Sequence, residues 1–218
     1  MPDGSGDRQP TITVTGVGSV DADPDRVEVH LVLASEDPDR QKAFQHVSSR
    51  SQKLAKLLDS LQVASHRRHT TGIDLHEVTS AERKTVGYRA QAGMSVRLES
   101  EGPLEVLLAR AVKEVGASVG GLNWYLSSGH PAHLEALRRA TLDAQDRAQA
   151  VAEALRLSVA EVVEIRLTSS PTSRPHNFAM TRMRAAAAPE LEPGQLSASA
   201  EVEITFRLQH GHNSKGNS

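Results

Sequence analysis

The sequence contains no cysteine, few aromatic residues and no long apolar run, and each of these absences excludes a class of protein. Without cysteine the chain has no thiol nucleophile, no disulfide and no thiolate-bound metal. Aromatic residues make up only 3% of the 218 residues, so the core must consist mainly of Val, Leu, Ile and Ala. No apolar run approaches the roughly 20 residues that span a bilayer, which predicts a protein without an integral membrane segment.

The charge of the chain also points to no partner. It has 25 basic and 27 acidic residues and a net charge of -2, so no overall field attracts nucleic acid or an anionic membrane. The first residues, MPDGSGDRQP, have neither the basic start nor the apolar stretch of a secretory signal. We therefore expect a soluble protein that is cytoplasmic as the sequence is written and that binds no nucleic acid.

Hydrophobic periodicity and turn-forming residues predict most of the strands and helices. Predicted strands cover residues 11–20, 26–34, 69–79, 84–99, 119–127, 161–169 and 197–208, and predicted helices cover about 38–62, 103–116 and 131–157. The first two strands are separated by a turn-forming cluster that contains Pro24, which predicts a hairpin. The order ββαββαβαββ predicts an α+β fold with a mainly antiparallel sheet and three helices packed on it.

Two patterns compete for the buried face of the longest predicted helix. An apolar stripe at helical spacing is expected to face the core: Leu134, Leu137, Thr141, Ala144, Ala148, Val151 and Leu155. Alanine also recurs every four residues from Ala136 to Ala152. We interpret this repeat as helix-favouring filler, and the alternative is a close approach of the helix to a sheet or to another helix.

Capping residues and strand parity give two further expectations. Asp37 followed by Pro38 predicts the N-terminal cap and first turn of the first helix. In the fourth strand, seven residues of one parity are expected to face the core: Val86, Tyr88, Ala90, Ala92, Met94, Val96 and Leu98.

The domain boundaries follow from where this periodicity begins and ends. We expect a flexible tail over 1–10, a single domain over 11–209 and a second flexible tail over 210–218. Residues 170–194 hold four of the ten prolines and no sustained periodicity, which predicts a long loop. A structureless connection of that length is usually functional or disordered. Its basic and adaptable apolar side chains predict contact with another subunit or protein: Arg174, Phe178, Met180, Arg182, Met183 and Arg184.

Residue types that carry chemistry form no recognisable catalytic or metal site. The histidine pairs considered as metal ligands are His66 with His69, His69 with His76, His130 with His133, and His210 with His212. His69 and His76 are seven residues apart on one predicted strand, so they should point to opposite faces. The remaining pairs lack carboxylates at ligand spacing or lie in polar turns and tails, and we interpret all of these histidines as surface residues.

Glycine and serine motifs give no active site either. Gly16-Val17-Gly18 follows a strand, but Asp21 stands where a dinucleotide-binding motif requires its third glycine. We interpret these glycines as permitting a bulge or bend. No serine lies in a nucleophile elbow. The basic run from His66 to His69 is interpreted as a solvated patch, with anion binding as the alternative. We therefore expect no catalytic residue, no cofactor and no metal.

Several short motifs occur in a fixed order along the chain. They are Val14-Thr15-Gly16-Val17-Gly18, Pro24-Asp25, Thr70-Thr71-Gly72, Gly87-Tyr88, the alanines 140, 144 and 148, Glu192-Pro193-Gly194, and Val202-x-Ile204-x-Phe206. Together with the order of elements, they resemble the SIMPL-domain family over about residues 11–209.

The resemblance implies a non-enzymatic α+β domain of a kind found in bacterial periplasmic and surface antigens and in a eukaryotic kinase-associated adaptor. It also implies self-association and a role in tolerance of oxidative stress, and it assigns no catalytic residue. Our first hypothesis is an oligomeric scaffold or adaptor that contacts a partner through residues 170–194. The alternatives are a small-ligand carrier or uncharacterised enzyme with carboxylates or His69 and Tyr88 in a cleft, and a chaperone-like protein.

Overall fold

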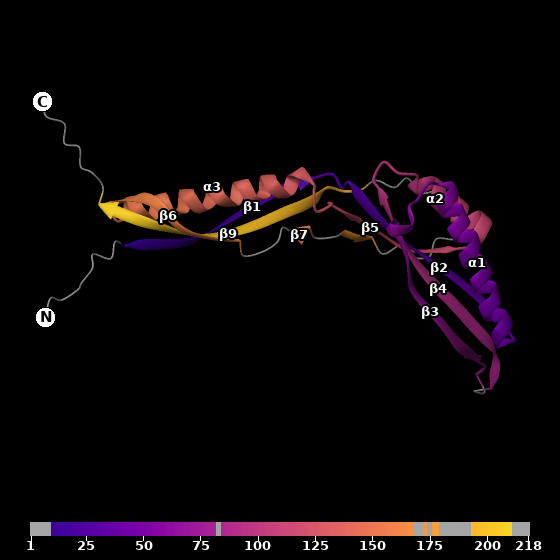
Figure 1. The fold of residues 1–218 in the computed structure, drawn as a ribbon. Helices are drawn as coiled ribbons and strands as arrows, with labels where there is room; N and C mark the ends of the chain where they lie inside the picture. The colour runs from indigo at the N-terminus through magenta and orange to yellow at the C-terminus, as the bar shows by residue number, and fades with distance from the viewer. Residues whose placement is uncertain (1–9, 82–83, 168–171, 174–175, 179–192, 211–218) are drawn as a thin grey trace, which may run out of the picture. The chain divides into compact units, whose positions relative to one another are not determined.

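The computed structural model describes residues 10–81, 84–167, 172–173, 176–178 and 193–210 (Figure 1). Its contacts divide the chain into two compact units. Unit 1 combines residues 1–22, 128–174 and 195–218, and unit 2 combines residues 23–127 and 175–194. The single domain expected over 11–209 stays a prediction, because contacts define compact units and do not test whether each folds alone.

Unit 1 is an antiparallel sheet with one long helix on one face. Its elements are β1 (Thr11–Ala22), α3 (Pro131–Ala154), β6 (Leu157–Leu167), β7 (Thr172–Ser173) and β9 (Leu196–His210). The strand order is β1-β9-β6, and β7 also pairs with β9. Alternate residues of β9, from Leu196 to Leu208, are buried. Figure 1 shows α3 lying along this sheet, where it contacts β1 and β9 more extensively than β6.

The alanine repeat forms the buried face of α3, so the predicted stripe is correct at Ala144 and Ala148 but wrong for its larger side chains, none of which is buried. Six alanines at four-residue intervals are buried: Ala132, Ala136, Ala140, Ala144, Ala148 and Ala152. By contrast, Leu134 of the predicted stripe is 74% exposed, and Leu155 is 61% exposed. The glycines of β1 explain why alanines and not the larger side chains face the sheet, because a Cβ on Gly16 would lie 2.0 Å from the Ala140 carbonyl oxygen. Only small side chains fit between backbones this close.

Gly16 and Gly18 therefore serve helix packing, not the bend or hairpin bulge inferred from the sequence. A Cβ on Gly18 would lie 2.2 Å from the carbonyl oxygen of Ala136, one helical turn before the contact made by Gly16. The alanine face of α3 thus lies directly against the backbone of β1. The alternative reading of the alanine repeat, a close approach to a sheet, is the correct one.

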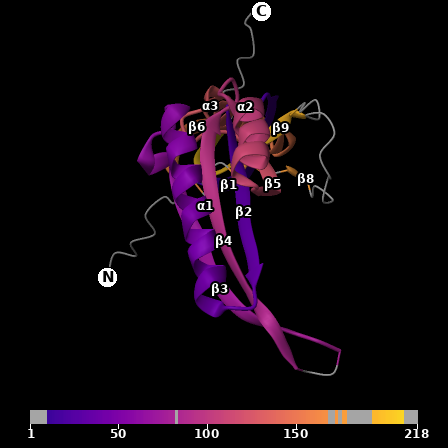
Figure 2. The same cartoon turned by 90° about the vertical axis from the view of Figure 1, so that its right-hand side faces the viewer.

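Unit 2 is a second antiparallel sheet with its helices on one face (Figure 2). Its longer elements are β2 (Arg26–Asp37), α1 (Arg40–Ser60), β3 (Arg68–Thr79), β4 (Thr85–Glu99), α2 (Leu104–Arg110) and β5 (Ser118–Tyr125). Its shorter elements are a 3-10 turn (Ser65–Arg67), a π-helical turn (Ala111–Val115) and β8 (His176–Phe178). The strand order is β3-β4-β2-β5-β8, and α1 packs on β2 and β4.

The α+β class and the predicted order of the longer elements are confirmed, but the strands form two sheets instead of one. The predicted hairpin of the first two strands is wrong. β1 pairs with β9, whereas β2 pairs with β4 and β5. The turn-forming residues after Ala22 instead connect unit 1 to unit 2. Local turn chemistry cannot distinguish a hairpin from a passage between two sheets.

Two smaller expectations also need correction. The helix cap is Asp39, whose carboxylate accepts hydrogen bonds from the backbone N–H groups of Gln41 and Lys42, and not Asp37. In β4, Ala90, Ala92, Val96 and Leu98 are buried as predicted, but Val86 is exposed. The last residue of β2, Asp37, pairs with Tyr88, and Val86 lies two residues beyond that pair. Val86 therefore has no partner on β2 and is not covered by the helix that packs on β2.

Candidate functional site

The partner-binding residues predicted from the sequence lie almost entirely outside the described residues. Arg174, Met180, Arg182, Met183 and Arg184 are in this group. For Phe178 the structure describes the backbone alone, which pairs with Leu122 of β5. Partner binding by these six residues stays a prediction, and two other surfaces show features that a binding site requires.

The first surface is an apolar strip on β6, at one edge of the unit 1 sheet. Val162, Ile165 and Leu167 are 50%, 59% and 66% exposed. They pair with Phe206, Ile204 and Val202 of β9, which are buried on the face that α3 covers. The strip therefore lies on the helical face of the sheet, on a strand that α3 contacts less than it contacts β1 or β9. We call Val162, Ile165 and Leu167 the β6 strip.

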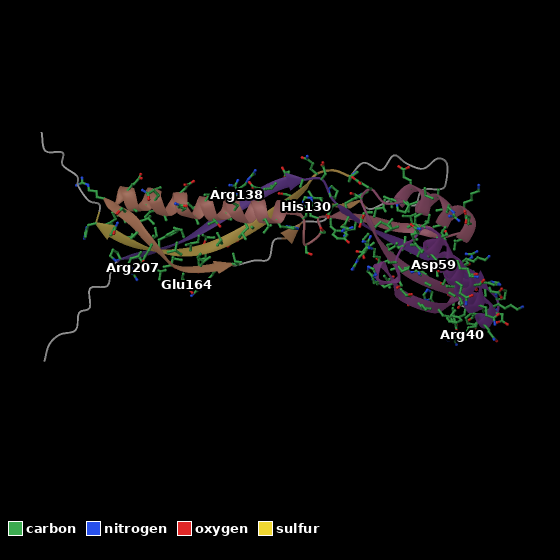
Figure 3. The ribbon with its side chains drawn as sticks, turned by 45° about the horizontal axis from the view of Figure 1, so that its top comes forward. Arg40, Asp59, His130, Arg138, Glu164 and Arg207 are labelled. Carbon is green, nitrogen blue, oxygen red and sulfur yellow. The ribbon has the colours of Figure 1, made fainter. Side chains whose placement is uncertain are left out.

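The opposite face of β6 carries ion pairs. Glu161 pairs with Arg207, and Arg166 pairs with Glu203 and Glu164. Figure 3 labels Glu164 and Arg207 on the neighbouring strands β6 and β9. Two bulges, at Ala160 and Val163, bring all the charges to one face and the β6 strip to the other. The three residues of the β6 strip thus share one side of the strand, and Val163, which is 48% exposed, lies at the second bulge.

The two edge strands of this sheet, β1 and β6, differ in the hydrogen bonds that side chains of α3 make with them. Asp143 of α3 accepts a hydrogen bond from the backbone N–H of Val17 at 2.8 Å, and Arg139 donates to the carbonyl of Ser19 at 2.9 Å. The bond from Val17, followed by Arg147, holds the pKa of Asp143 below its ordinary value. The helix thereby occupies backbone groups at the edge of β1. Among the described residues no such side chain reaches the β6 edge from α3.

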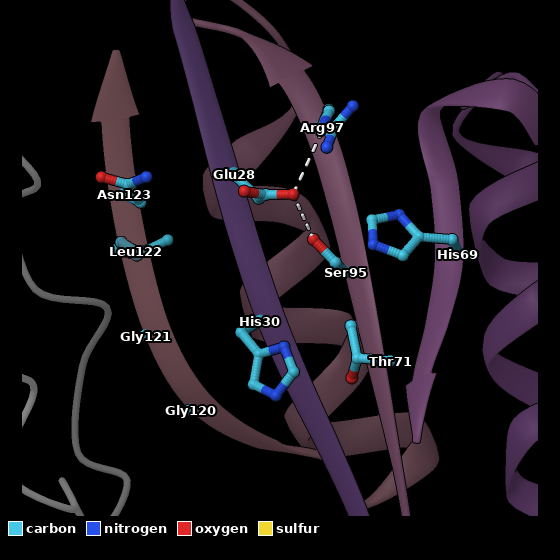
Figure 4. Close-up of a pocket in the computed structure, with 10 residues that line it drawn as sticks. All are labelled: Glu28, His30, His69, Thr71, Ser95, Arg97, Gly120, Gly121, Leu122 and Asn123. Atoms are coloured by element: carbon cyan, nitrogen blue, oxygen red, sulfur yellow. Dashed lines mark hydrogen bonds and ion pairs between the residues drawn. The ribbon is translucent and has the colours of Figure 1, made fainter. Parts of the chain in front are cut away.

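The second surface is a polar hollow on the face of the unit 2 sheet that carries no helix (Figure 4). Its volume is about 580 Å³, and β2, β3, β4 and β5 all contribute to it. Strand register arranges the lining residues in two adjacent rows. One row holds Asn123, Glu28 and Arg97, and the next holds Gly121, His30, Ser95 and His69. Directly opposed residues of antiparallel strands share a face, so both rows point into the hollow.

Glu28 organises the centre of the hollow. Its Oε1 accepts a hydrogen bond from the Ser95 hydroxyl at 2.6 Å and another from Arg97 Nε at 3.1 Å, as the dashed lines in Figure 4 show. The Ser95 bond, and then the bond and charge of Arg97 and the charge of His69, keep the pKa of Glu28 below its ordinary value although burial opposes this. The carboxylate is therefore ionised and its charge is balanced within the site.

Three glycines make the space around His30. A Cβ on Gly120 would lie 2.9 Å from the His30 ring, and a Cβ on Gly93 would lie 2.4 Å from the Thr71 hydroxyl and 3.3 Å from the ring. Gly121, directly opposite His30 on β5, has nothing within 4 Å of its Cβ position. The imidazole thus lies between two glycine backbones with open space beside it.

The hollow contains several side-chain groups with free hydrogen-bonding capacity, and one of them is the Oδ1 of Asn123, a buried acceptor without a hydrogen-bond partner among the described residues. In the described part of the chain, the rings of His30 and His69 and the hydroxyl of Thr71 take part in no hydrogen bond. Arg97 uses its Nε alone, so its two terminal nitrogens also remain available. The described residues include no three His, Asp or Glu side chains placed to hold a metal ion. The available groups of the hollow can bind a polar ligand.

Two expectations about the histidines are wrong. His133 is buried and is not a surface residue. The bulge between Thr70 and Gly72 puts His69 and His76 on the same face of β3.

Other residues considered from the sequence have structural roles. His130 caps α3, where its Nδ1 accepts a hydrogen bond from the Ala132 N–H at 3.2 Å (Figure 3). In the basic run, Arg67 pairs with Glu99 and Arg68 pairs with Asp59. Both arginines thus have acidic partners at the surface.

His69 was the one hollow residue that the sequence marked for a cleft. Its suggested companion Tyr88 does not line the hollow, because it pairs with Asp37 at the far end of β4. Glu28, His30, Ser95 and Arg97 were missed. The signal available was their alternation with Val27, Val29, Val96 and Leu98, which marks a polar face but does not say which strands are neighbours.

Comparison with known proteins identifies a sequence family and two bacterial proteins that are similar to this chain. The sequence model of a family named SIMPL, described as a protein of unknown function (DUF541), matches residues 12–206. A 26 kDa periplasmic immunogenic protein of Brucella abortus (strain S19) is 25% identical over 215 residues, which cover 91% of this chain and 84% of that protein. A protein of the same name from Brucella melitensis biotype 1 has the same identity and coverage. Within the described residues, no helix has the length and apolarity needed to cross a membrane.

Proposed function

The chain belongs to the SIMPL family, and from this premise we propose that it is a non-enzymatic scaffold that associates with further copies of itself through the β6 strip. The observation that carries the proposal is the exposure of Val162, Ile165 and Leu167 beside buried neighbours on β9. A contiguous exposed apolar strip at the edge of a sheet is typical of a surface that packs against another molecule.

The bulges in β6 determine what kind of contact is expected. They interrupt the regular spacing of backbone groups at Ala160 and Val163, which disfavours continuous pairing with a strand of another chain. Packing of side chains on the helical face of the sheet does not need that regularity. The β6 strip is therefore expected to form the apolar centre of the contact, with the ion-paired face of β6 directed away from it.

The expected strength is modest. Each half-exposed side chain of the strip has about 1 kcal/mol still to gain from burial. Two copies that bury both strips would gain about 6 kcal/mol before the cost of association is subtracted. Such a contact needs further surface to persist at low concentration. Sedimentation velocity over a wide concentration range is therefore the appropriate measurement.

The test compares two variants of unit 1. In the first, Ile165→Thr and Leu167→Ser remove most of the strip, and threonine keeps the β-branched shape that strands favour. In the control, Leu134→Ser changes a leucine of α3 that is 74% exposed and lies outside the strip. We expect the native chain and the control to associate with rising concentration and the strip variant to remain monomeric. A native chain that is monomeric throughout, or a strip variant that associates equally, would contradict the proposal.

Three expectations from the sequence remain separate predictions. Contact through residues 170–194 is tested by deleting residues 174–188, which removes all six predicted contact residues, and repeating the sedimentation measurement. A role in tolerance of oxidative stress is tested by survival of a deletion strain under peroxide. The cytoplasmic location is tested by fractionation of cells that express the chain from its native gene.

A further inference from the structure

The polar hollow of unit 2 has the character of a ligand site, and its features do not depend on self-association. It is built from four neighbouring strands of one sheet, and its volume of about 580 Å³ is in the range of small-molecule pockets. Its polar residues are not paired among themselves into a closed network, apart from the bonds at Glu28 Oε1. Its floor is lined by glycines, which leave the space empty.

We propose that this hollow binds the oxyanion of a small molecule, a carboxylate or a phosphate, over the row formed by His30, Ser95 and His69. Register places the two histidines on opposite sides of Ser95, with their Cα atoms roughly 10 Å apart across two strand spacings. An oxyanion between them would accept hydrogen bonds from both rings. It would also lie beside the Arg97 side chain in the adjacent row.

The donors that remain available in the hollow can surround an oxyanion, while Asn123 Oδ1 and Glu28 Oε2 can accept from polar groups elsewhere on the ligand. Available donors are the two imidazole rings, the Thr71 hydroxyl and the terminal nitrogens of Arg97. Guanidinium groups bind carboxylates and phosphates through paired N–H donors, and two such donors remain on Arg97. The one carboxylate, Glu28, is already compensated by Arg97 and Ser95.

The second oxygen of Glu28 adds a requirement on the rest of the ligand. The Ser95 and Arg97 bonds of Glu28 both end on Oε1 and leave Oε2 available. A hydroxyl or amino group next to the oxyanion could donate to this oxygen. Small hydroxylated or aminated oxyanions therefore fit the hollow better than simple apolar acids.

The test follows the histidine ring signals of the full chain by NMR during titration with inorganic phosphate, with glycolate and, as a neutral control, with glucose. Concentrations reach about 20 mM at constant pH and ionic strength, which suffices to detect a dissociation constant near 1 mM. His76, exposed on the same strand as His69, serves as internal reference. We expect His30 and His69 to shift saturably with phosphate, glycolate or both, and neither glucose nor the His76 signal to respond.

A variant that fills the hollow provides the decisive comparison. Gly121→Val places a side chain opposite His30 where the structure has open space, and Gly129→Val adds the same side chain at an open position in unit 1. We expect at least about tenfold weaker binding by Gly121→Val and unchanged binding by Gly129→Val. If Gly121→Val fails to fold, Arg97→Gln takes its place with the same expectation. Absence of any shift with both oxyanions, or equal binding by the hollow variants and the native chain, overturns the proposal.

The failure of this proposal and that of the assembly proposal are distinguishable. Sedimentation of the β6 strip variant tests assembly without any ligand, and the titration reads residues of unit 2 alone. Preference for phosphate or for glycolate identifies which of the two oxyanion sources the hollow accepts.

Discussion

Replacing Gly16 with alanine should separate α3 from the sheet of unit 1. The added Cβ would lie 2.0 Å from the Ala140 carbonyl oxygen, 2.5 Å from the Ala144 nitrogen and 2.7 Å from the Ala144 Cβ. To restore ordinary contact, the helix must retreat by roughly 1.4 Å at this turn. A gap of that size removes much of the dispersion energy between the alanine face and β1.

The cost of this change lies at the upper end of the range for overpacked cores. Such substitutions cost about 1–3 kcal/mol, and here two of the three obstructing atoms are helix backbone that cannot change rotamer. We therefore expect a loss of about 3 kcal/mol in the free energy of unfolding of unit 1. For a protein stable by about 5–15 kcal/mol, this is a large fraction.

Hydrogen exchange and urea unfolding measure the effect. Amides of α3 and β1 should exchange faster in Gly16→Ala, while those of β2 and β4 in unit 2 remain protected. Urea unfolding followed by circular dichroism should show an earlier transition. Gly129→Ala is the matched control, because a Cβ there has nothing within 4 Å. If Gly16→Ala and Gly129→Ala unfold at the same urea concentration, the backbone-contact explanation of the alanine repeat is incorrect.

Two further predictions concern unit 2. Asp39→Ala should lower the midpoint of urea unfolding, because it removes the carboxylate that accepts hydrogen bonds from the backbone N–H groups of Gln41 and Lys42 at the start of α1. Asp39→Asn keeps a capping oxygen and should leave the midpoint unchanged. The lowered pKa of Glu28 means that its contribution to stability is fully present above its unfolded-state value near 4.5 and is lost as the pH falls through the lower folded-state value. Stability measured from pH 6 down to pH 3 should therefore fall less steeply in Ser95→Ala, which lacks the bond that lowers this pKa most, and an unchanged slope would refute this assignment.

The candidate sites were predicted less well than the fold, for reasons visible in single residues. His30 and His69 are 39 positions apart in the sequence, and only the pairing of β2 and β3 with β4 brings them to either side of Ser95. Likewise, the sequence placed Ile165 and Leu167 in a predicted strand over residues 161–169 but did not mark them as exposed. Their exposure depends on where α3 lies over the sheet, which periodicity does not contain.

The sequence by itself determined the α+β class, the order of the longer strands and helices and the end of the helical segment at Gly116, because these depend on local periodicity, propensity and capping. Tertiary structure alone decided that the first two strands belong to different sheets and that alanines form the buried face of α3. Both outcomes have the same physical cause. The partner of a strand and the closeness of a helix depend on side chains far away in the sequence, and the glycines of β1 select the alanine face only once α3 lies against them.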